Sequence, residues 1–274
     1  MRKIFVLVTL LLLSACSSSL VYNNADTLLG WWIGKYIDFT DAQQPLVDQT
    51  IDEWLAWHRQ NELPQYRTQL LRLRNAISTS DLTQDELASH FDIAQGHTAR
   101  IRQRIAPDIA KIGVTLNLDQ LSQLFATINH ERSERAEEFA ERQRKQPKRS
   151  ERLTENISEY LGRMTPAQKT IVEDYAQQLN ATYELWREYG DTSNHTARQI
   201  LLTAAFDNQA QTKLAHFIVE QESLQTAALQ SAAEQNKALY INMLWAIFPT
   251  LTDAQRDHLI DKIDEYLDLI ESLS

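Results

Sequence analysis

Apolar residues recur at helical spacing along most of the chain. Between residues 22 and 37, Leu28, Trp32 and Tyr36 lie four positions apart, which places them on one face of a helix. The same pattern predicts further helices over residues 41–77, 82–112, 118–146, 148–161, 166–189, 196–206, 208–248 and 253–270. No stretch alternates apolar and polar residues convincingly over the length of a strand. We therefore predict an all-α fold, a bundle of about eight helices, several of them long and kinked.

Helix ends are marked by a proline and by a recurring capping pattern. Pro64 lies inside the helix predicted over 41–77 and should kink it, because proline lacks the backbone N–H. At five places an apolar residue precedes Thr or Asn, and Gln or Glu follows three positions later, with the capping residue at Thr40, Thr83, Asn117, Thr165 and Thr252. In such a box the cap oxygen accepts from a backbone N–H, and the Gln or Glu side chain reaches back to the cap. The pattern is explained if each of these five places is the start of a helix in a bundle.

The amino terminus has the features of an export signal. Arg2 and Lys3 precede an apolar run from Ile4 to Leu13, which is shorter than the roughly 20 residues that span a bilayer. The run ends at Leu13-Ser14-Ala15-Cys16, which resembles the lipobox of bacterial lipoproteins. That resemblance implies a signal peptide over 1–15, a lipidated tether over 16–21 and a helical periplasmic domain over 22–274. The alternative is an ordinary signal peptide that leaves a cysteine near its cleavage site.

Cys16 is the only cysteine of the chain, so it has no partner for an internal disulfide. Lipidation would explain why this exported chain has a single cysteine. Stable anchoring in a membrane requires more than one acyl chain. The resemblance implies that Cys16 carries several, palmitate among them. The following residue is Ser17 and not aspartate, which is similar to the outer-membrane sorting pattern of enteric-type lipoproteins. We expect a lipid anchor in the outer membrane and a body that faces the periplasm.

The charge of the chain narrows the possible partners. The formal net charge is −10, and removal of Arg2 and Lys3 with the signal would make the mature chain more negative. Nucleic acid is an unfavourable partner, because affinity for it comes from neutralising phosphates. An acidic body is also not expected to lie flat on anionic lipid, so the lipid on Cys16 should supply the main membrane contact.

Two resemblances bear on function. The segments Tyr22–Asp26, Trp31-Trp32, Tyr36–Asp38, Trp54…Trp57-His58 and Glu62–Tyr66 resemble a family of uncharacterised proteobacterial lipoproteins. This resemblance implies a lipidated, helical, periplasm-facing protein, and it supplies no catalytic residues. The segments Met164–Gln168 and Leu251–Gln255 are similar to the LTxxQ motif of small periplasmic helical chaperones.

Motifs that would carry enzymatic chemistry are missing from the sequence. The seven histidines form no HExxH pair, and the chain has neither a Gly-rich phosphate loop nor a Gly-x-Ser-x-Gly elbow. His130, Glu131 and Glu134 could share one helix face, but the density of Arg and Glu around them favours a solvated face. We predict no catalytic residue, no metal site, no cofactor and no small-molecule substrate.

Two groups of residues are candidates for contact with a membrane or a partner. Trp31 and Trp32 belong to an aromatic cluster that either packs in the core or, for Trp31, rests at the level of lipid headgroups. The second group is a basic run around Pro147, which is either a solvated turn or a basic tip that touches lipid phosphate or an acidic partner. Its residues are Arg142, Arg144, Lys145, Lys148 and Arg149.

These observations favour a non-enzymatic envelope protein that acts as a helical scaffold or interaction module. The alternative function is a chaperone-like holdase for unfolded periplasmic proteins. A holdase requires an exposed, concave apolar face, and this requirement separates the two hypotheses.

Overall fold

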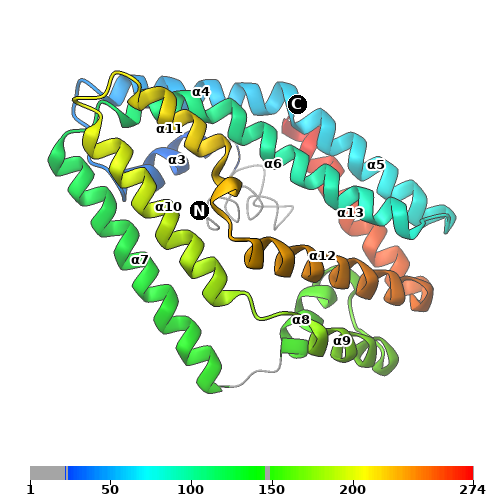
Figure 1. The fold of residues 1–274 in the computed structure, drawn as a ribbon. Helices are drawn as coiled ribbons and strands as arrows, with labels where there is room; N and C mark the ends of the chain where they lie inside the picture. The colour runs from blue at the N-terminus through cyan, green and yellow to red at the C-terminus, as the bar shows by residue number, and fades with distance from the viewer. Residues whose placement is uncertain (1–21, 23, 146–148, 274) are drawn as a thin grey trace. The chain divides into compact units, whose positions relative to one another are not determined.

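The computed structural model describes residues 22, 24–145 and 149–273. These residues form helices and no strand, which confirms the all-α prediction (Figure 1). Cys16, Lys148 and the side chain of Lys145 lie outside the described residues. The helices are α3 (Ala25–Gly34), α4 (Gln44–Asn61), α5 (Leu63–Thr79), α6 (Gln84–Gly113), α7 (Leu118–Lys145), α8 (Arg149–Leu161), α9 (Pro166–Gln178), α10 (Tyr183–Thr203), α11 (Ala210–Val219), η1 (Gln221–Leu224), α12 (Ala227–Ile247), η2 (Phe248–Thr250) and α13 (Asp253–Leu273).

The described helices are more numerous than predicted, because several predicted helices are broken. The kink expected at Pro64 is confirmed as a break, since α4 ends at Asn61 and α5 begins at Leu63. The helix predicted over 208–248 is divided by η1, and Thr226 caps α12 with its side chain after this interruption.

The prediction of one helix over 166–189 is wrong. Helix α9 ends at Gln178, and Leu179 has extended backbone angles. The cause lies on α12, where Asn236 binds the next residue through both ends of its amide. Its Oδ1 accepts from the N–H of Asn180 at 2.8 Å, and its Nδ2 donates to the carbonyl of Asn180 at 3.1 Å. Backbone groups that would continue the helix are therefore bonded elsewhere.

Helix α10 in turn continues through Gly190, where the sequence predicted a gap. Arg132 of α7 donates to the Gly190 carbonyl at 2.7 Å and also bonds the Asp191 carboxylate. Helices α7 and α10 lie side by side, and these bonds of Arg132 are among the contacts that join them (Figure 1).

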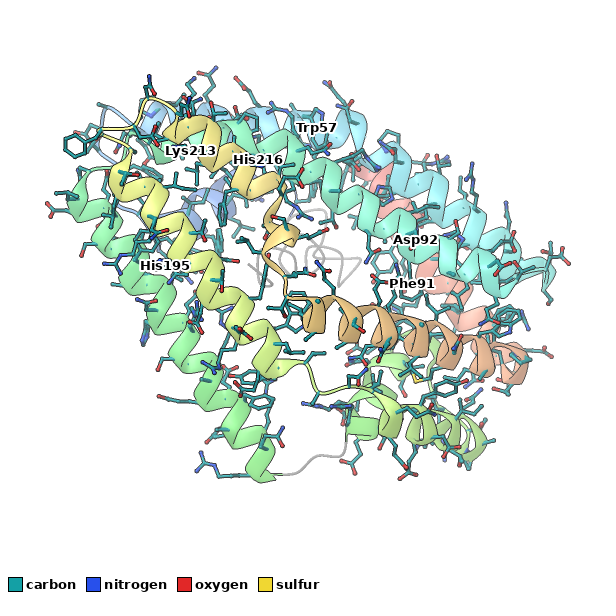
Figure 2. The ribbon with its side chains drawn as sticks, in the orientation of Figure 1. Trp57, Phe91, Asp92, His195, Lys213 and His216 are labelled. Atoms are coloured by element: carbon teal, nitrogen blue, oxygen red, sulfur yellow. The ribbon has the colours of Figure 1, made fainter. Side chains whose placement is uncertain are left out.

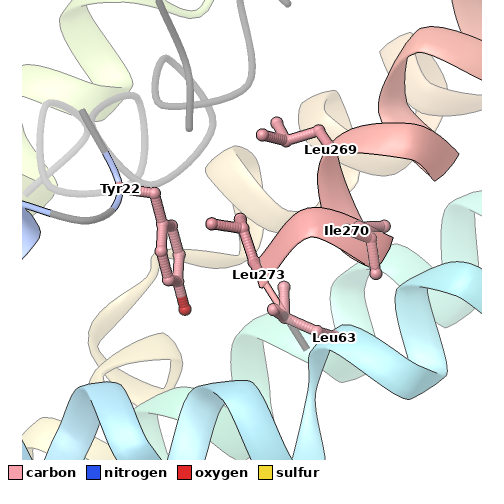
Figure 3. Close-up of a cluster of buried hydrophobic side chains, with 5 residues drawn as sticks. All are labelled: Tyr22, Leu63, Leu269, Ile270 and Leu273. Carbon is pink, nitrogen blue, oxygen red and sulfur yellow. The ribbon is translucent and has the colours of Figure 1, made fainter. Parts of the chain in front are cut away.

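The chain divides into two compact units, and each has its own core. The first unit comprises Met1–Leu82 and Leu259–Ser274, and the second comprises Thr83–His258. In the first unit, Tyr22 and Leu63 pack against the end of α13, as the close-up shows (Figure 3). The residues of α13 in this cluster are Leu269, Ile270 and Leu273, and Tyr66 and Leu70 pack against it.

The core of the second unit lies where α6, α7, α10 and α11 meet. Its buried residues are Ala110, Leu121, Phe125, Leu201 and Leu214. Gly113 allows this close packing, because a Cβ there would lie 2.9 Å from Leu214 and 3.3 Å from Leu201. None of the described helices combines the length and the apolar character needed to cross a membrane.

Candidate functional site

A groove of about 410 Å³ lies in the second unit between α6, α10 and α12. Leu179 and Thr182, which lie between the end of α9 and the start of α10, also line the groove. The lining residues are Phe91, Leu179, Thr182, Trp186, Ala233, Asn236, Lys237 and Tyr240. Those of α12 recur at helical spacing and therefore share one face of the helix.

Aromatic rings dominate the lining of the groove. Phe91 and Tyr240 meet edge to face with their centroids 6.0 Å apart. Trp186 packs edge-on against Tyr189, with centroids 5.6 Å apart, and stays 41% exposed. Burial raises the pKa of Tyr240 above its ordinary value. The groove thus presents aromatic side chains from α6, α10 and α12.

Two polar side chains of the groove, those of Asn236 and Lys237, are already bonded within the second unit. Asn236 is engaged by Asn180, as described above. The ammonium of Lys237 donates to Asp92 at 2.7 Å and to Gln95 at 2.9 Å. Phe91 and Asp92 lie on the side of α6 that faces α12 (Figure 2). What the groove offers to an occupant is therefore mainly apolar, which suits hydrophobic side chains and not acid–base chemistry.

A second hollow of about 500 Å³ lies over the α8–α9 hairpin. Its lining carries charges of both signs, from Glu155, Glu159, Arg163 and Lys169. We regard the aromatic groove as the candidate site, since it combines apolar surface with side chains from distant parts of the sequence.

Two glutamines of the predicted capping boxes form a buried pair in the second unit. Gln168 Nε2 donates to Gln255 Oε1 at 2.8 Å, and Gln255 Nε2 donates to Gln168 Oε1 at 2.9 Å. Gln168 also donates to the carbonyl of Thr250 at 3.1 Å, and Gln255 donates to that of Arg163 at 3.0 Å. Each accepting carbonyl lies two residues before the other glutamine's capping threonine, so the arrangement has approximate two-fold symmetry.

Both glutamines also complete their capping boxes. Gln168 Oε1 accepts from the N–H of Thr165 at 2.9 Å, and Gln255 Oε1 accepts from that of Thr252 at 3.1 Å. The pair therefore joins the starts of α9 and α13. The sequence identified both capping boxes but gave no sign that their glutamines meet.

The first unit contains a different polar network around His58. The Tyr22 hydroxyl lies 2.7 Å from His58 Nδ1, and the Tyr66 hydroxyl lies 3.3 Å from His58 Nε2. Burial lowers the pKa of His58 to about 4, against the opposing effect of the Glu62 carboxylate. Burial also raises the pKa of Tyr22. A neutral imidazole has one donor and one acceptor, which suits two hydroxyl partners.

The structure separates the two predicted tryptophans. Trp31 is 64% exposed, and the Lys35 ammonium lies 3.8 Å from the centroid of its ring. Trp32 is partly buried, with its ring centroid 4.9 Å from that of Tyr36. Trp31 is therefore a surface residue of α3, while Trp32 packs against its own chain.

The described members of the basic run have different surroundings. Arg142 is exposed and pairs with Glu138 at 3.0 Å, and exposed Arg144 donates to the carbonyl of Ala140 at 3.4 Å. Arg149 is partly buried and donates to the carbonyl of Leu179. Arg149 thus supports the segment that borders the groove, a role the sequence did not reveal.

The possible ligand group on α7 lies on a solvated helix face. His130 lies 3.6 Å from Glu134, and both side chains are mostly exposed. In the described part of the chain, no three His, Cys, Asp or Glu side chains are grouped so as to hold a metal ion.

Comparison with known protein families finds one family whose model matches the chain. The model of a family of unknown function, DUF6279, matches residues 35–229, which is more than half of the sequence. The chain belongs to this family. The DUF6279 match begins at the end of α3 and reaches the first turn of α12, so it includes Phe91 and Trp186 of the groove. No curated protein and no solved structure matches the chain. Membership in DUF6279 assigns no activity, and the lipobox and the chaperone resemblance stay predictions.

Proposed function

We propose that this DUF6279 protein is a lipid-anchored envelope protein that binds an apolar segment of another protein in its aromatic groove. The observation that carries the proposal is the groove itself, in which Phe91, Trp186 and Tyr240 supply apolar surface while Asn236 and Lys237 are bonded internally. Tyrosine and tryptophan in such pockets are typical anchors of protein interfaces. The protein would act as a non-enzymatic interaction module.

The anchor in this proposal is the lipid on Cys16, in the outer membrane and with the body facing the periplasm. Support comes from the sequence around Cys16, where a short apolar run ends in a lipobox-like segment. If the anchor is correct, Cys16→Ala should leave an unprocessed precursor and remove the protein from the outer-membrane fraction. Unchanged processing and fractionation would contradict the anchor and leave the groove proposal untouched.

The experiment for the groove uses two neighbouring positions on α12. A photoreactive amino acid is placed at Ala233, which lines the groove, or at Glu234, which is exposed and outside it. After irradiation of cells, the amino acid at position 233 should form a cross-link to one defined envelope protein, and the one at position 234 should not. In the protein that carries the photoreactive amino acid at position 233, Trp186→Ala should reduce the cross-linking yield at least about tenfold. Loss of a tryptophan at the centre of an interface typically costs more than about 2 kcal/mol of binding free energy.

The outcomes of this experiment are distinct. Equal yields at the two positions, or a yield unaffected by Trp186→Ala, would refute the groove as the docking site. Circular dichroism of the Trp186→Ala variant checks that its helices are retained.

The holdase function is the second candidate, and the exposed face of Trp186 is the observation that favours it. A holdase would cross-link many unrelated chains from Ala233 and would suppress aggregation of an unfolded protein in solution. A single partner without such suppression would exclude it. The groove volume of about 410 Å³ suits a few side chains of one defined segment and favours the interaction module.

A further inference from the structure

Helix α3 of the first unit is apolar and largely uncovered. Its ten residues include one charged side chain, Asp26, and its only buried residue is Ala25. Leu28 is 39% exposed and Trp31 is 64% exposed. An isolated exposed leucine is ordinary on a protein surface, but two large apolar residues one turn apart form a continuous surface.

The exposed residues lie along one side of the helix. Leu28, Trp31 and Lys35 are spaced by three and four positions, so they form a stripe. Asp26 lies two residues before Leu28 and therefore projects from the opposite side of α3. The stripe thus combines apolar side chains with a cation and contains no carboxylate.

The contact between Lys35 and Trp31 defines the end of this stripe. The ammonium lies 3.8 Å from the ring centroid, within the range of a cation–π interaction. Tryptophan rings are enriched at the membrane–water interface, and lysine near them extends its ammonium toward phosphate. Anionic lipid attracts such a cation near the membrane surface.

The position of α3 in the sequence adds an independent constraint. Ala25 lies nine positions after Cys16, so a fully extended chain between them would reach at most about 30 Å. With a lipid on Cys16, the start of α3 stays within about 30 Å of the bilayer surface. The acidic charge of the chain disfavours broad contact with anionic lipid, which makes a local contact through α3 the more specific one.

We infer that α3 is a second membrane contact, with Leu28 and Trp31 inserted among the lipid headgroups and Lys35 at the phosphates. This inference rests on the proposed lipid anchor. Insertion of α3 would fix how the first unit is oriented on the membrane, whereas the lipid on Cys16 alone would only limit its distance from the membrane.

The test uses the mature lipidated protein, which begins at Cys16, in vesicles of zwitterionic and anionic lipid with bromine atoms near the top of the acyl chains. Bromine quenches tryptophan at short range, and we expect measurable quenching that Trp31→Phe abolishes. The matched control is Trp186→Phe, which changes an exposed tryptophan of the second unit and should leave the quenching unchanged. Lys35→Glu should reduce the quenching in vesicles that contain anionic lipid.

Flotation of the vesicles distinguishes the two possible failures. If the protein floats with the vesicles but Trp31→Phe leaves the quenching unchanged, the α3 contact is refuted and the anchor stands. If the lipid-modified chain does not float at all, the proposed anchor fails and the α3 inference fails with it. Circular dichroism confirms that the Trp31→Phe variant is folded.

Discussion

Both units bury polar side chains, but the groups that satisfy their hydrogen bonds differ in chemistry. In the second unit, Gln168 and Gln255 are neutral amides, and their donors and acceptors are bonded to each other or to backbone groups. In the first unit, His58 lies between two tyrosine hydroxyls and has a pKa of about 4. The amide pair does not titrate, while the imidazole does. The comparison indicates that acid should affect the first network directly and leave the bonding of the second unchanged.

The largest expected effect follows from breaking the amide pair. Gln168→Ala removes the bonds between the two amides and leaves the Gln255 amide buried without them. We expect a loss of about 3 to 5 kcal/mol in the free energy of unfolding, since each unsatisfied buried group costs about 1 to 3 kcal/mol and the cap adds about 1. This loss is measured by urea unfolding with circular dichroism as the signal.

Two further variants distinguish the effect of the amide pair on stability from the effect of an ordinary capping box. Glu86→Ala removes the corresponding side-chain bond to Thr83, on the surface, and should cost clearly less than Gln168→Ala, because the Thr83 hydroxyl still accepts from the backbone N–H of residue 86 and no buried amide loses a partner. The double variant Gln168→Ala with Gln255→Ala should lose less than the sum of the single variants, because neither amide is left unmatched. Additive losses would show that the two amides are not coupled.

A smaller effect is expected from acid on the first unit. The pKa of His58 is about 4 in the folded protein and 6.5 when unperturbed, so the unfolded chain binds a proton first as pH falls. The contribution of neutral His58 to the free energy of unfolding is therefore fully present above about pH 6.5. It is lost progressively as the pH falls to about 4, by up to about 3 kcal/mol.

The measurement is urea unfolding at several pH values, followed by tryptophan fluorescence. Trp54 and Trp57 lie on the same helix as His58 and report on the first unit. His58→Gln cannot titrate and should have a flatter profile between pH 4 and 6.5. Parallel profiles for the two proteins would show that His58 is not the source of the pH dependence.

The smallest effect concerns an ion pair at the surface of the first unit. Arg74 binds Asp264 through two bonds of 2.5 and 2.8 Å, and the arginine holds the pKa of that carboxyl below its ordinary value. Because both side chains are partly exposed, Arg74→Ala should lower the melting temperature only slightly, and high salt should remove the difference. A salt-independent loss as large as that of Gln168→Ala would contradict this ranking.

Local sequence patterns predicted helix starts well. The complete capping boxes at Thr83 and Thr165 are confirmed, and Asn117 and Gln120 exchange the expected bonds. At Thr40 the side-chain contact with Gln43 forms, but the regular helix begins only at Gln44. These features depend on a few neighbouring residues, so they can be recognised without the fold.

The groove and both polar networks depend on residues far apart in the sequence. Asn236 ends a helix 56 positions earlier, and the paired glutamines are 87 positions apart. Neither contact leaves a local pattern, because any exposed Asn or a single capping glutamine has the same sequence appearance. The exposure of Trp31 was partly foreseeable, since it lies one position away from the apolar stripe of its helix.

The amide pair also has a consequence for how this protein can change over generations. A polar replacement of Gln168 alone would confront Gln255 with groups that it cannot match, while two compensating replacements could restore a fit. The DUF6279 match ends at residue 229, so position 255 lies beyond it. Among relatives whose chains contain both positions, 168 and 255 should therefore vary together, and a lineage that lost one glutamine should have lost the other.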